Sequence, residues 1–209
     1  MNAHLEQHHH VLETALGHHV SRETWDKLVH YADLLVKWQA SINLVSASTL
    51  PVLWERHILD SAQIIPFLPE KDEPLKIMDM GSGGGFPALV LAILTSHDIH
   101  CVESDSRKSA FLRTVAREVN VPVSMHVSRV ENLPFMACDV ITARALAPLQ
   151  KLLELSGKQH HADLRCIFLK GRNAAREKRD LKGFDQLLIT SHVSMTSDDS
   201  SIFTVENFN

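Results

Sequence analysis

The spacing of apolar residues divides the 209-residue chain into two parts. Before about residue 72 the apolar positions recur at helical spacing, which predicts helices over 2–19, from the N-cap Ser21 to a turn at Asn43, and from Thr49 through Ser61. After residue 75, short apolar runs alternate with amphipathic segments. The runs predict strands near 75–80, 99–103, 122–127, 138–143 and 164–170. The segments between and after them predict helices near 86–95, 106–119, 147–157 and 173–182.

The two patterns together imply an α/β fold. Strands that alternate with helices form a parallel sheet with helices on both faces. Two later apolar runs, at 186–190 and 202–205, have no helix between them, so we expect them to pair antiparallel at one edge of the sheet. We therefore predict a single domain over 1–209, in which an N-terminal helical cap, 1–72, covers a core over 73–209.

A glycine-rich turn follows the first predicted strand and opens the first helix of the core. It reads Asp79-Met80-Gly81-Ser82-Gly83-Gly84-Gly85-Phe86-Pro87, and its glycines let the main chain turn sharply and let a ligand approach it closely. A helix that begins there points its free N–H groups at that ligand. A glycine turn alone is weak evidence, because a tight strand-to-helix turn without a ligand has the same pattern.

Two acidic residues indicate which ligand suits this turn. Asp79 gives the pattern D-x-G-x-G-x-G instead of the dinucleotide pattern G-x-G-x-x-G, and a carboxylate there would repel a pyrophosphate, which disfavours an NAD enzyme. It suits S-adenosylmethionine, whose sulfonium and ammonium groups are positive. Glu103 ends the second predicted strand 22 positions after Gly81, about where a ribose-binding acid lies in a βαβ unit. We therefore predict that S-adenosylmethionine is the cofactor.

Polar residues also follow the later strands. The segment Ser128-Arg129-Val130-Glu131 follows the third predicted strand, Arg144 the fourth and Lys170 the fifth. Ligands of open α/β sheets bind at the carboxyl ends of the strands, where these residues converge. Each residue alone could be a helix cap or a surface ion pair, so it is the convergence that favours a site.

The end of the fourth strand carries a clue about the target. Methyltransferases that act on exocyclic amino groups of nucleobases often have an N-P-P-[YF] turn there, whereas this chain has Thr142-Ala143-Arg144-Ala145-Leu146. An arginine suits an acceptor-rich target, such as N7 and O6 of guanine, which a guanidinium can bind with two hydrogen bonds.

Two basic stretches flank the predicted site, one on the helix after Glu103 and one after the fifth strand. Their members are Arg107, Lys108, Arg113 and Arg117, and Lys170, Arg172, Arg176, Lys178, Arg179 and Lys182. Acidic residues are interspersed, so these stretches either bind phosphate or are ordinary solvated helix faces. The net charge of −4 argues against a protein that coats nucleic acid indiscriminately.

Composition disfavours several other classes of protein. No apolar run approaches the roughly 18–20 residues that span a bilayer, and the N-terminus lacks a signal-peptide pattern, so we expect a cytoplasmic protein without membrane contact. The three separated cysteines are expected to be buried thiols without disulfides. The histidine clusters at 8–10, 18–19 and 160–161 have no acid or cysteine at zinc-ligand spacing, so we expect solvated histidines and no metal site.

Several segments together resemble a known family. They are Asn43-Leu44-Val45, Glu55-Arg56-His57-Ile58-Leu59-Asp60-Ser61, the turn over 79–87, Ser128-Arg129-Val130-Glu131, Ala143-Arg144-Ala145 and Leu169-Lys170-Gly171. Over about residues 25–182 the chain is similar to the bacterial small-subunit (16S) ribosomal RNA guanine-N7 methyltransferases, also called the glucose-inhibited division protein B family. The R-H-I-L-D-S segment is the specific part, since the glycine turn alone points only to the wider methyltransferase class.

The resemblance implies a class I S-adenosylmethionine-dependent methyltransferase fold with a seven-stranded sheet. It implies cofactor contacts at Gly81, Phe86, Val130, Glu131 and Arg144. The glycine turn and the end of the second predicted strand add Asp79, Gly83 and Glu103 to the predicted cofactor site.

The resemblance also implies a reaction, which we expect to be methylation of guanine N7 in small-subunit ribosomal RNA. N7 has a free lone pair and loses no proton when it attacks, so no general base is expected. Arg144 is the predicted catalytic residue, and it would position the base or the methionine end of the cofactor. Lys170, Arg107 and Arg172 are predicted to bind the RNA through phosphate.

Some alternatives stay open at this stage. His57 and Asp60 either brace the helical cap or have an ordinary structural role. The substrate could be free RNA or the 30S particle, and we expect a monomer. The alternative functions are methyl transfer to another RNA or to a small molecule, and a non-catalytic RNA-binding module.

Overall fold

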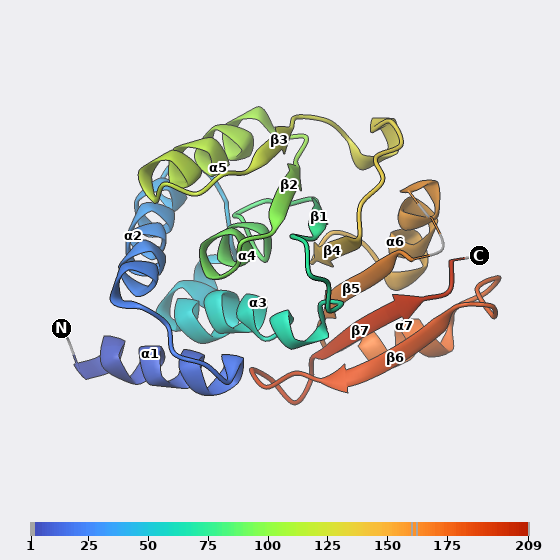
Figure 1. The fold of residues 1–209 in the computed structure, drawn as a ribbon, viewed down its shortest axis with the longest axis horizontal. Coiled ribbons are helices and arrows are strands. Elements are labelled where there is room, and N and C mark those ends of the chain that lie inside the picture. Colours follow the sequence, from blue (N-terminus) through green and yellow to red (C-terminus); the bar gives the residue numbers. More distant parts are fainter. Residues whose placement is uncertain (1–2, 160, 162, 209) are drawn as a thin grey trace.

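The computed structural model describes residues 3–159, 161 and 163–208, and its centre is a seven-stranded sheet (Figure 1). The strand order is β3-β2-β1-β4-β5-β7-β6. The strands are β1 Lys76–Met80, β2 Asp98–Val102, β3 Ser124–His126, β4 Val140–Arg144, β5 Arg165–Lys170, β6 Leu188–Val193 and β7 Ser201–Glu206. The first five strands are parallel, and β7 runs antiparallel to both β5 and β6. The predicted mostly parallel sheet with an antiparallel edge is confirmed.

Helices cover both faces of this sheet, as the alternating pattern predicts. The α-helices that carry most of the packing are α1 Ala3–Leu16, α2 Arg22–Gln39, α4 Ala88–Leu94, α5 Ser106–Glu118, α6 Leu149–Ser156 and α7 Ala174–Arg179. Side chains alternate between the two faces along each strand. Ile77 of β1 therefore lies in one apolar cluster with α2, α4 and α5, whereas its neighbour Met78 lies in the other cluster with α6 and α7.

The N-terminal helices share the core of the sheet. Trp25, Leu28, Tyr31 and Leu35 on α2 are fully buried, and they belong to the same apolar cluster as Leu89 of α4. Ser21 caps α2 by accepting a hydrogen bond from the Thr24 N–H, as the sequence predicts. The side chains of the N-terminal helices and of the sheet layer therefore pack in one apolar cluster.

The prediction of a regular helix from Thr49 through Ser61 is wrong. The segment is a 3₁₀-helix, η1, over Ala47–Val52, then a π-helix, η2, over Trp54–Leu59, then a single α-helical turn, α3, over Asp60–Ala62. Pro51 lies inside η1 and has no N–H to donate, so a continuous α-helical ladder cannot form through it. Short π-helical segments such as η2 recur at functional sites of proteins.

The remaining short segments complete the chain. They are the 3₁₀-helices η3 Ile65–Phe67, η4 Val130–Asn132 and η5 Gly157–Gln159. The sixth strand extends further than the predicted run over 186–190, to Val193. Its pairing with β7 continues because backbone hydrogen bonds at an exposed edge need no apolar side chains.

Two expectations from composition can be compared with the structure. The cysteines are buried free thiols, as predicted, and they are Cys101, Cys138 and Cys166. Within the described ranges, no helix is both long and apolar enough to cross a membrane.

The glycine turn between β1 and α4 is fixed from behind by α2. The Tyr31 hydroxyl donates a hydrogen bond of 2.5 Å to the Gly84 carbonyl. Gly85 has a φ of +93°, and a Cβ added there would lie 2.6 Å from Leu89 Cδ1 and 2.7 Å from the Tyr31 hydroxyl oxygen. Both the dihedral angle and the available space therefore require glycine at this position.

Gly85→Ala should reduce the free energy of unfolding by about 2–4 kcal/mol, because a left-handed dihedral costs about 1–2 kcal/mol and overpacking about 1–3 kcal/mol. Urea denaturation measures the loss. Gly157→Ala is the matched control, since Gly157 has a φ of −57° and an added Cβ would have nothing within 4 Å. Equal stability of the Gly85→Ala protein and the wild type would contradict this account of the turn.

Candidate active site

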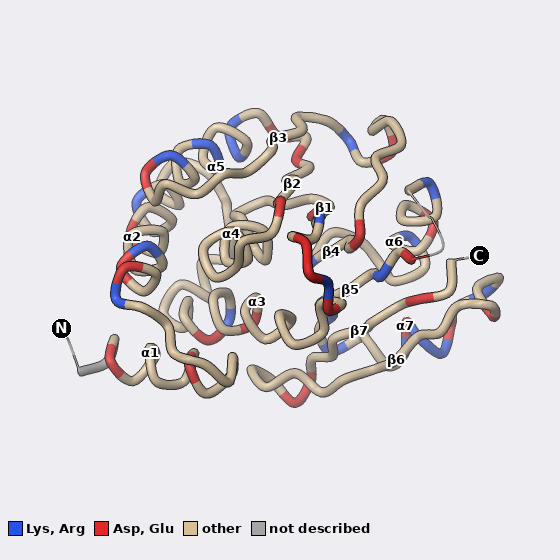
Figure 2. Tube along the Cα trace, in the orientation of Figure 1, with Lys and Arg blue, Asp and Glu red and all other residues tan. Residues whose placement is uncertain are grey.

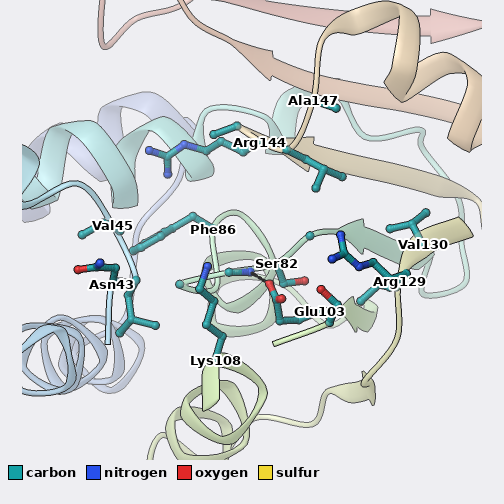
Figure 3. Close-up of a pocket in the computed structure, with 18 of the residues that line it drawn as sticks. Asn43, Val45, Ser82, Phe86, Glu103, Lys108, Arg129, Val130, Arg144 and Ala147 are labelled. Carbon is teal, nitrogen blue, oxygen red and sulfur yellow. Dashed lines mark hydrogen bonds between the residues drawn. The ribbon is translucent and has the colours of Figure 1, made fainter. Parts of the chain in front are cut away.

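A cavity of about 960 Å³ opens at the carboxyl ends of β1, β2 and β4. Figure 3 shows Asn43 and Val45 of the cap on one side of it and Arg129 and Val130 on the other, with the glycine turn between them. Seven of the predicted cofactor residues line this cavity: Gly81, Gly83, Phe86, Glu103, Val130, Glu131 and Arg144. The fold therefore brings these predicted residues together at one place.

The glycine turn and Glu103 form one wall of the cavity. The N–H groups of Gly81 and Ser82 donate to the Val102 carbonyl at the end of β2. Glu103 follows directly, and its two carboxylate oxygens accept hydrogen bonds from the N–H groups of Gly83, at 2.9 Å, and Asp105, at 2.8 Å. The carboxylate is thus held in one orientation at the cavity wall, with lone pairs left to accept from a ligand hydroxyl.

Asp79, the eighth predicted cofactor residue, lies beneath the turn and does not line the cavity. Its side chain is 1% exposed, and Oδ1 accepts a hydrogen bond from the Thr142 hydroxyl at 2.8 Å. Burial raises the pKa of Asp79 to about 7, and Oδ2 has no hydrogen-bond partner in the described structure. The sequence pattern located the residue correctly on β1, but strand burial turned the carboxylate inward toward β4.

Arg144 is held at the cavity by residues of the cap. Its Nε lies 3.2 Å from the Asp60 carboxylate, and its Nη2 donates to the Arg56 carbonyl at 2.7 Å and to His57 Nδ1 at 2.6 Å. Burial lowers the pKa of the guanidinium and the Asp60 carboxylate offsets this effect. Among the described residues nothing hydrogen-bonds to Nη1 of Arg144. The side chain is therefore fixed on one side and has a donor group left over.

His57 can accept a hydrogen bond from Arg144 because its imidazole ring is neutral. Burial, together with the positive charges of Arg144 and Arg56, lowers the pKa of His57 to about 3. With Nδ1 accepting, the proton belongs on Nε2, which lies 2.7 Å from the Thr49 hydroxyl oxygen. That hydroxyl in turn donates to the Ser46 carbonyl at 2.7 Å. His57 thus positions Arg144, a role more specific than the bracing of the cap that the sequence suggested.

Asp60 connects Arg144 to the far end of the chain. Its Oδ1 accepts hydrogen bonds from Gln63 Nε2 at 2.8 Å and from the Thr196 hydroxyl at 2.9 Å. Gln63 also accepts from the Met195 N–H at 2.9 Å. This connection could not be predicted from the sequence, because Thr196 lies in the turn between β6 and β7 and belongs to no recognisable motif.

Phe86 separates the Arg144 network from the apolar core. Its ring stacks on His57 with 4.9 Å between centroids and packs against Tyr31 at 5.3 Å. The Arg144 guanidinium carbon lies 5.4 Å above the same ring, within the range of a cation–π contact. Phe86 therefore supports the guanidinium as well as lining the cavity.

The predicted RNA-binding residues lie outside this cavity. The Lys170 ammonium donates to the Ala147 carbonyl at 2.7 Å and lies 2.8 Å from the Glu177 carboxylate, so it is already satisfied within the protein. Arg107 is exposed at the start of α5, 4.0 Å from Asp105. Its neighbour Lys108, a member of the same basic stretch, lines the cavity instead. Arg172 is exposed and lines a second cavity, described below.

The histidines at 10, 18 and 19 are exposed, as the sequence predicts, whereas His8 and His9 are partly buried. His8 stacks on Trp54, with 5.6 Å between centroids, and His9 packs on Trp25 at 4.7 Å. His160 lies outside the described residues. In the part of the chain that the structure describes, no group of three or more His, Cys, Asp or Glu side chains is arranged to hold a metal ion.

The lowered pKa of His57 and the raised pKa of Asp79 should have opposite effects on how the free energy of unfolding depends on pH. Between about pH 4 and 6.5 the unfolded chain holds a proton on His57 that the folded chain lacks, so stability rises with pH. Over the same interval the folded chain holds a proton on Asp79 that the unfolded chain lacks, so stability falls with pH. The two effects nearly cancel in the wild type.

Single substitutions should therefore expose these slopes. Relative to wild type, Asp79→Asn should make the free energy of unfolding rise more steeply with pH, and His57→Asn should make it fall more steeply. Each change should approach ~1.4 kcal/mol per pH unit, the value for one proton. Urea denaturation between pH 4 and 6.5 measures both slopes. Parallel curves for the two variants and the wild type would refute the proposed protonation states.

Comparisons with known proteins identify the family of this chain. The profile of a family described as rRNA small subunit methyltransferase G, GidB, matches residues 24–201. A protein of that name from Paramagnetospirillum magneticum is 52% identical over 158 residues, which are 76% of each chain. The one from Gluconobacter oxydans is 42% identical over 189 residues, which cover 90% of this chain and 96% of the relative.

Solved structures share the fold at much lower identity. A variant of MtNAS in complex with S-adenosylmethionine has a TM-score of 0.61 and 12% identity, covering 87% of this chain and 74% of that one. A ribosomal protein L11 methylase from Lactobacillus delbrueckii subsp. bulgaricus has a TM-score of 0.58 and 15% identity, covering 71% of this chain and 77% of that one. These two likenesses establish a class I methyltransferase fold. The profile match and the identities above 40% show that the chain belongs to the rRNA small subunit methyltransferase G family.

Proposed function

We propose that this protein methylates guanine N7 in small-subunit ribosomal RNA with S-adenosylmethionine as the methyl donor. The observation that carries the proposal is the Arg144 guanidinium, which is fixed at the cavity by Asp60 and His57 and keeps Nη1 available. Membership of the family adds the substrate class, since the relatives are named for the small-subunit RNA.

The residues of the cavity fit the proposed cofactor. At Gly81, which has a φ of +71°, an added Cβ would lie 2.6 Å from Leu146 Cδ1, so the absence of a side chain keeps the cavity open at the turn. Glu103 offers a fixed carboxylate for the ribose hydroxyls, and Val130 offers an apolar wall for the adenine ring. A volume of about 960 Å³ also leaves space for a nucleobase beside the cofactor.

Asp79 supports this site indirectly. It is buried under the turn and bonded to Thr142, so its role is to fix the end of β1 against β4. Any charge that it carries acts on the cofactor through the turn and not by contact. Val130 and Glu131 line the opposite wall, where Glu131 is exposed and can accept a hydrogen bond.

The proposed reaction requires no proton transfer by a side chain of the protein. When bound, S-adenosylmethionine supplies a methyl group on a positively charged sulfur. Held by Gly81, Glu103 and Val130, it would supply the methyl carbon to the N7 lone pair and would leave as a neutral thioether, so that the positive charge would pass to the purine. No proton leaves N7, so no general base is required. What the protein must supply is orientation of the base toward the methyl carbon.

Arg144 is suited to that orientation. Its contacts with Asp60, His57 and the Arg56 carbonyl leave one amino group to donate to an acceptor such as O6 of guanine. Because His57 is neutral, it accepts from the guanidinium instead of repelling it. Phe86 keeps the guanidinium from moving away from the cavity on the apolar side.

Two basic surfaces support RNA as the substrate. Figure 2 shows Lys and Arg recurring along α5 and α7, on either side of the strand ends that form the site. Side chains such as Arg107 and Arg172 are exposed there and can contact phosphate. We further propose that the enzyme is a cytoplasmic monomer that acts on free RNA or on the 30S particle.

The deciding experiment supplies the purified protein with labelled S-adenosylmethionine and either unmethylated small-subunit RNA, 30S particles or a set of small metabolites. Label should enter one guanosine of the RNA, at N7, as shown by strand cleavage at 7-methylguanosine. Transfer to a metabolite but not to RNA would overturn the proposal. Absence of cofactor binding in calorimetry would leave only a non-catalytic RNA-binding module.

Arg144→Ala should reduce methyl transfer at least about a hundredfold, because the base loses its orienting donor. It should also destabilise the fold by about 3 kcal/mol, since it leaves the Asp60 carboxylate buried without its cation. Adding Asp60→Asn should recover part of that stability while methyl transfer stays low. Melting temperature and turnover, measured on the same samples, separate the two effects. Recovery of turnover in the double variant would show that Arg144 has only a structural role.

A further inference from the structure

A second cavity, of about 250 Å³, lies on the other side of Arg144 from the first. Arg144 and Ala145 line both cavities, so the end of β4 forms the wall between them. The rest of the second cavity is formed by the end of β5, the start of α7 and the base of the β6–β7 turn, with Lys170, Arg172, Asn173, Ser200 and Ser201 among its lining residues. Arg56, on η2, closes it from the cap.

The charges around this cavity do not balance. Four cations and two acids line it. The Asp60 carboxylate is paired with Arg144, and the Glu177 carboxylate is paired with Lys170. Both acids also accept further hydrogen bonds, from Thr196 in the first case and the Leu149 N–H in the second. The two ion pairs are therefore neutral within the protein, and neither contributes a net charge that would attract an anion to the second cavity.

The pairing leaves two guanidinium groups, those of Arg56 and Arg172, without a counterion. Neither side chain has an ion-pair or hydrogen-bond partner among the residues that the structure describes. Arg56 is half-buried, which makes an uncompensated charge there more costly than at the open surface. Two unpaired cations that face one small cavity, with hydroxyl and amide donors beside them, favour an anionic ligand.

The size of the cavity limits what that anion can be. At about 250 Å³ it is below the usual range of about 300–1,000 Å³ for pockets that hold a whole small molecule. A single phosphate group bound by arginines fits such a space, because guanidinium groups bind phosphate oxygens with paired hydrogen bonds. The shared wall at Arg144 and Ala145 places this group next to the base-binding cavity.

We propose that the second cavity binds a backbone phosphodiester of the RNA strand adjacent to the target guanosine, through Arg56 and Arg172. The inference rests on the proposed function and makes it more specific: Arg144 orients the base on one side of the wall, and the two free arginines hold the strand on the other. It also replaces Lys170 as a phosphate ligand, because the Lys170 ammonium is bound to Glu177.

The test uses Arg56→Gln, Arg172→Gln and the double variant, with binding of small-subunit RNA measured at several salt concentrations. Each single variant should bind RNA about tenfold more weakly and lose roughly 0.7–1 from the slope of log affinity against log salt, as expected for one lost phosphate contact. Affinity for S-adenosylmethionine should stay at the wild-type value. Arg56→Lys should keep most of the salt slope, which separates the loss of charge from a packing defect.

Arg22→Gln is the matched control, because Arg22 is exposed at the start of α2, pairs with Asp26 and lines neither cavity. It should leave RNA affinity and the salt slope unchanged. If Arg56→Gln and Arg172→Gln behave like this control while the wild type methylates RNA, the phosphate subsite is wrong and the proposed function stands. If the wild type binds RNA with the expected slope but transfers no methyl group to it, the proposed function is what fails.

Discussion

The contact on which the site depends is the one between a guanidinium and a neutral imidazole. An arginine beside a histidine is ordinarily a repulsive pair at low pH, and it becomes a hydrogen bond here only because His57 is buried and kept deprotonated. The Asp60 carboxylate supplies the opposite charge that makes a largely buried Arg144 tolerable. Remove either partner and the guanidinium could turn toward solvent, away from the cavity. The charge of Asp60 and the neutrality of His57, both in the cap, therefore determine how the Arg144 side chain is oriented at the end of β4.

This constraint explains why the cap and the sheet share one core. The residues that bind the Arg144 side chain lie on η2 and α3, whereas Arg144 itself is the last residue of β4. If the cap moved relative to the sheet, these three partners of Arg144 would move with it. The side chains of α2 prevent such a movement because they pack in the same apolar cluster as α4. The hydrogen bond from Tyr31 to Gly84 adds a polar link from that helix to the cofactor turn. Packing, turn geometry and arginine orientation are consequently coupled.

Much of this architecture could be predicted from the sequence, because it depends on local patterns. Strand and helix alternation gave the sheet, and the glycine turn with Glu103 located the cavity. Other features could not be predicted. The inward rotation of Asp79 depends on its partner Thr142, 63 positions away, and the pairing of Lys170 with Glu177 depends on how α7 packs. Thr196 was missed because a hydroxyl in a turn carries no recognisable pattern until the fold places it beside Asp60.

The hydrogen bond between Thr196 and Asp60 joins residues 136 positions apart, and this separation has a consequence for biosynthesis. The turn, the cap and Arg144 all leave the ribosome before the β6–β7 hairpin does. Until that hairpin emerges and folds back, Asp60 lacks the Thr196 hydroxyl and Gln63 lacks the Met195 N–H, so the carboxylate that pairs with Arg144 has fewer of the contacts that orient it. The last contacts of the network around Arg144 therefore form only after the segment near residue 196 has been synthesised, although the cofactor turn and the cap are made much earlier.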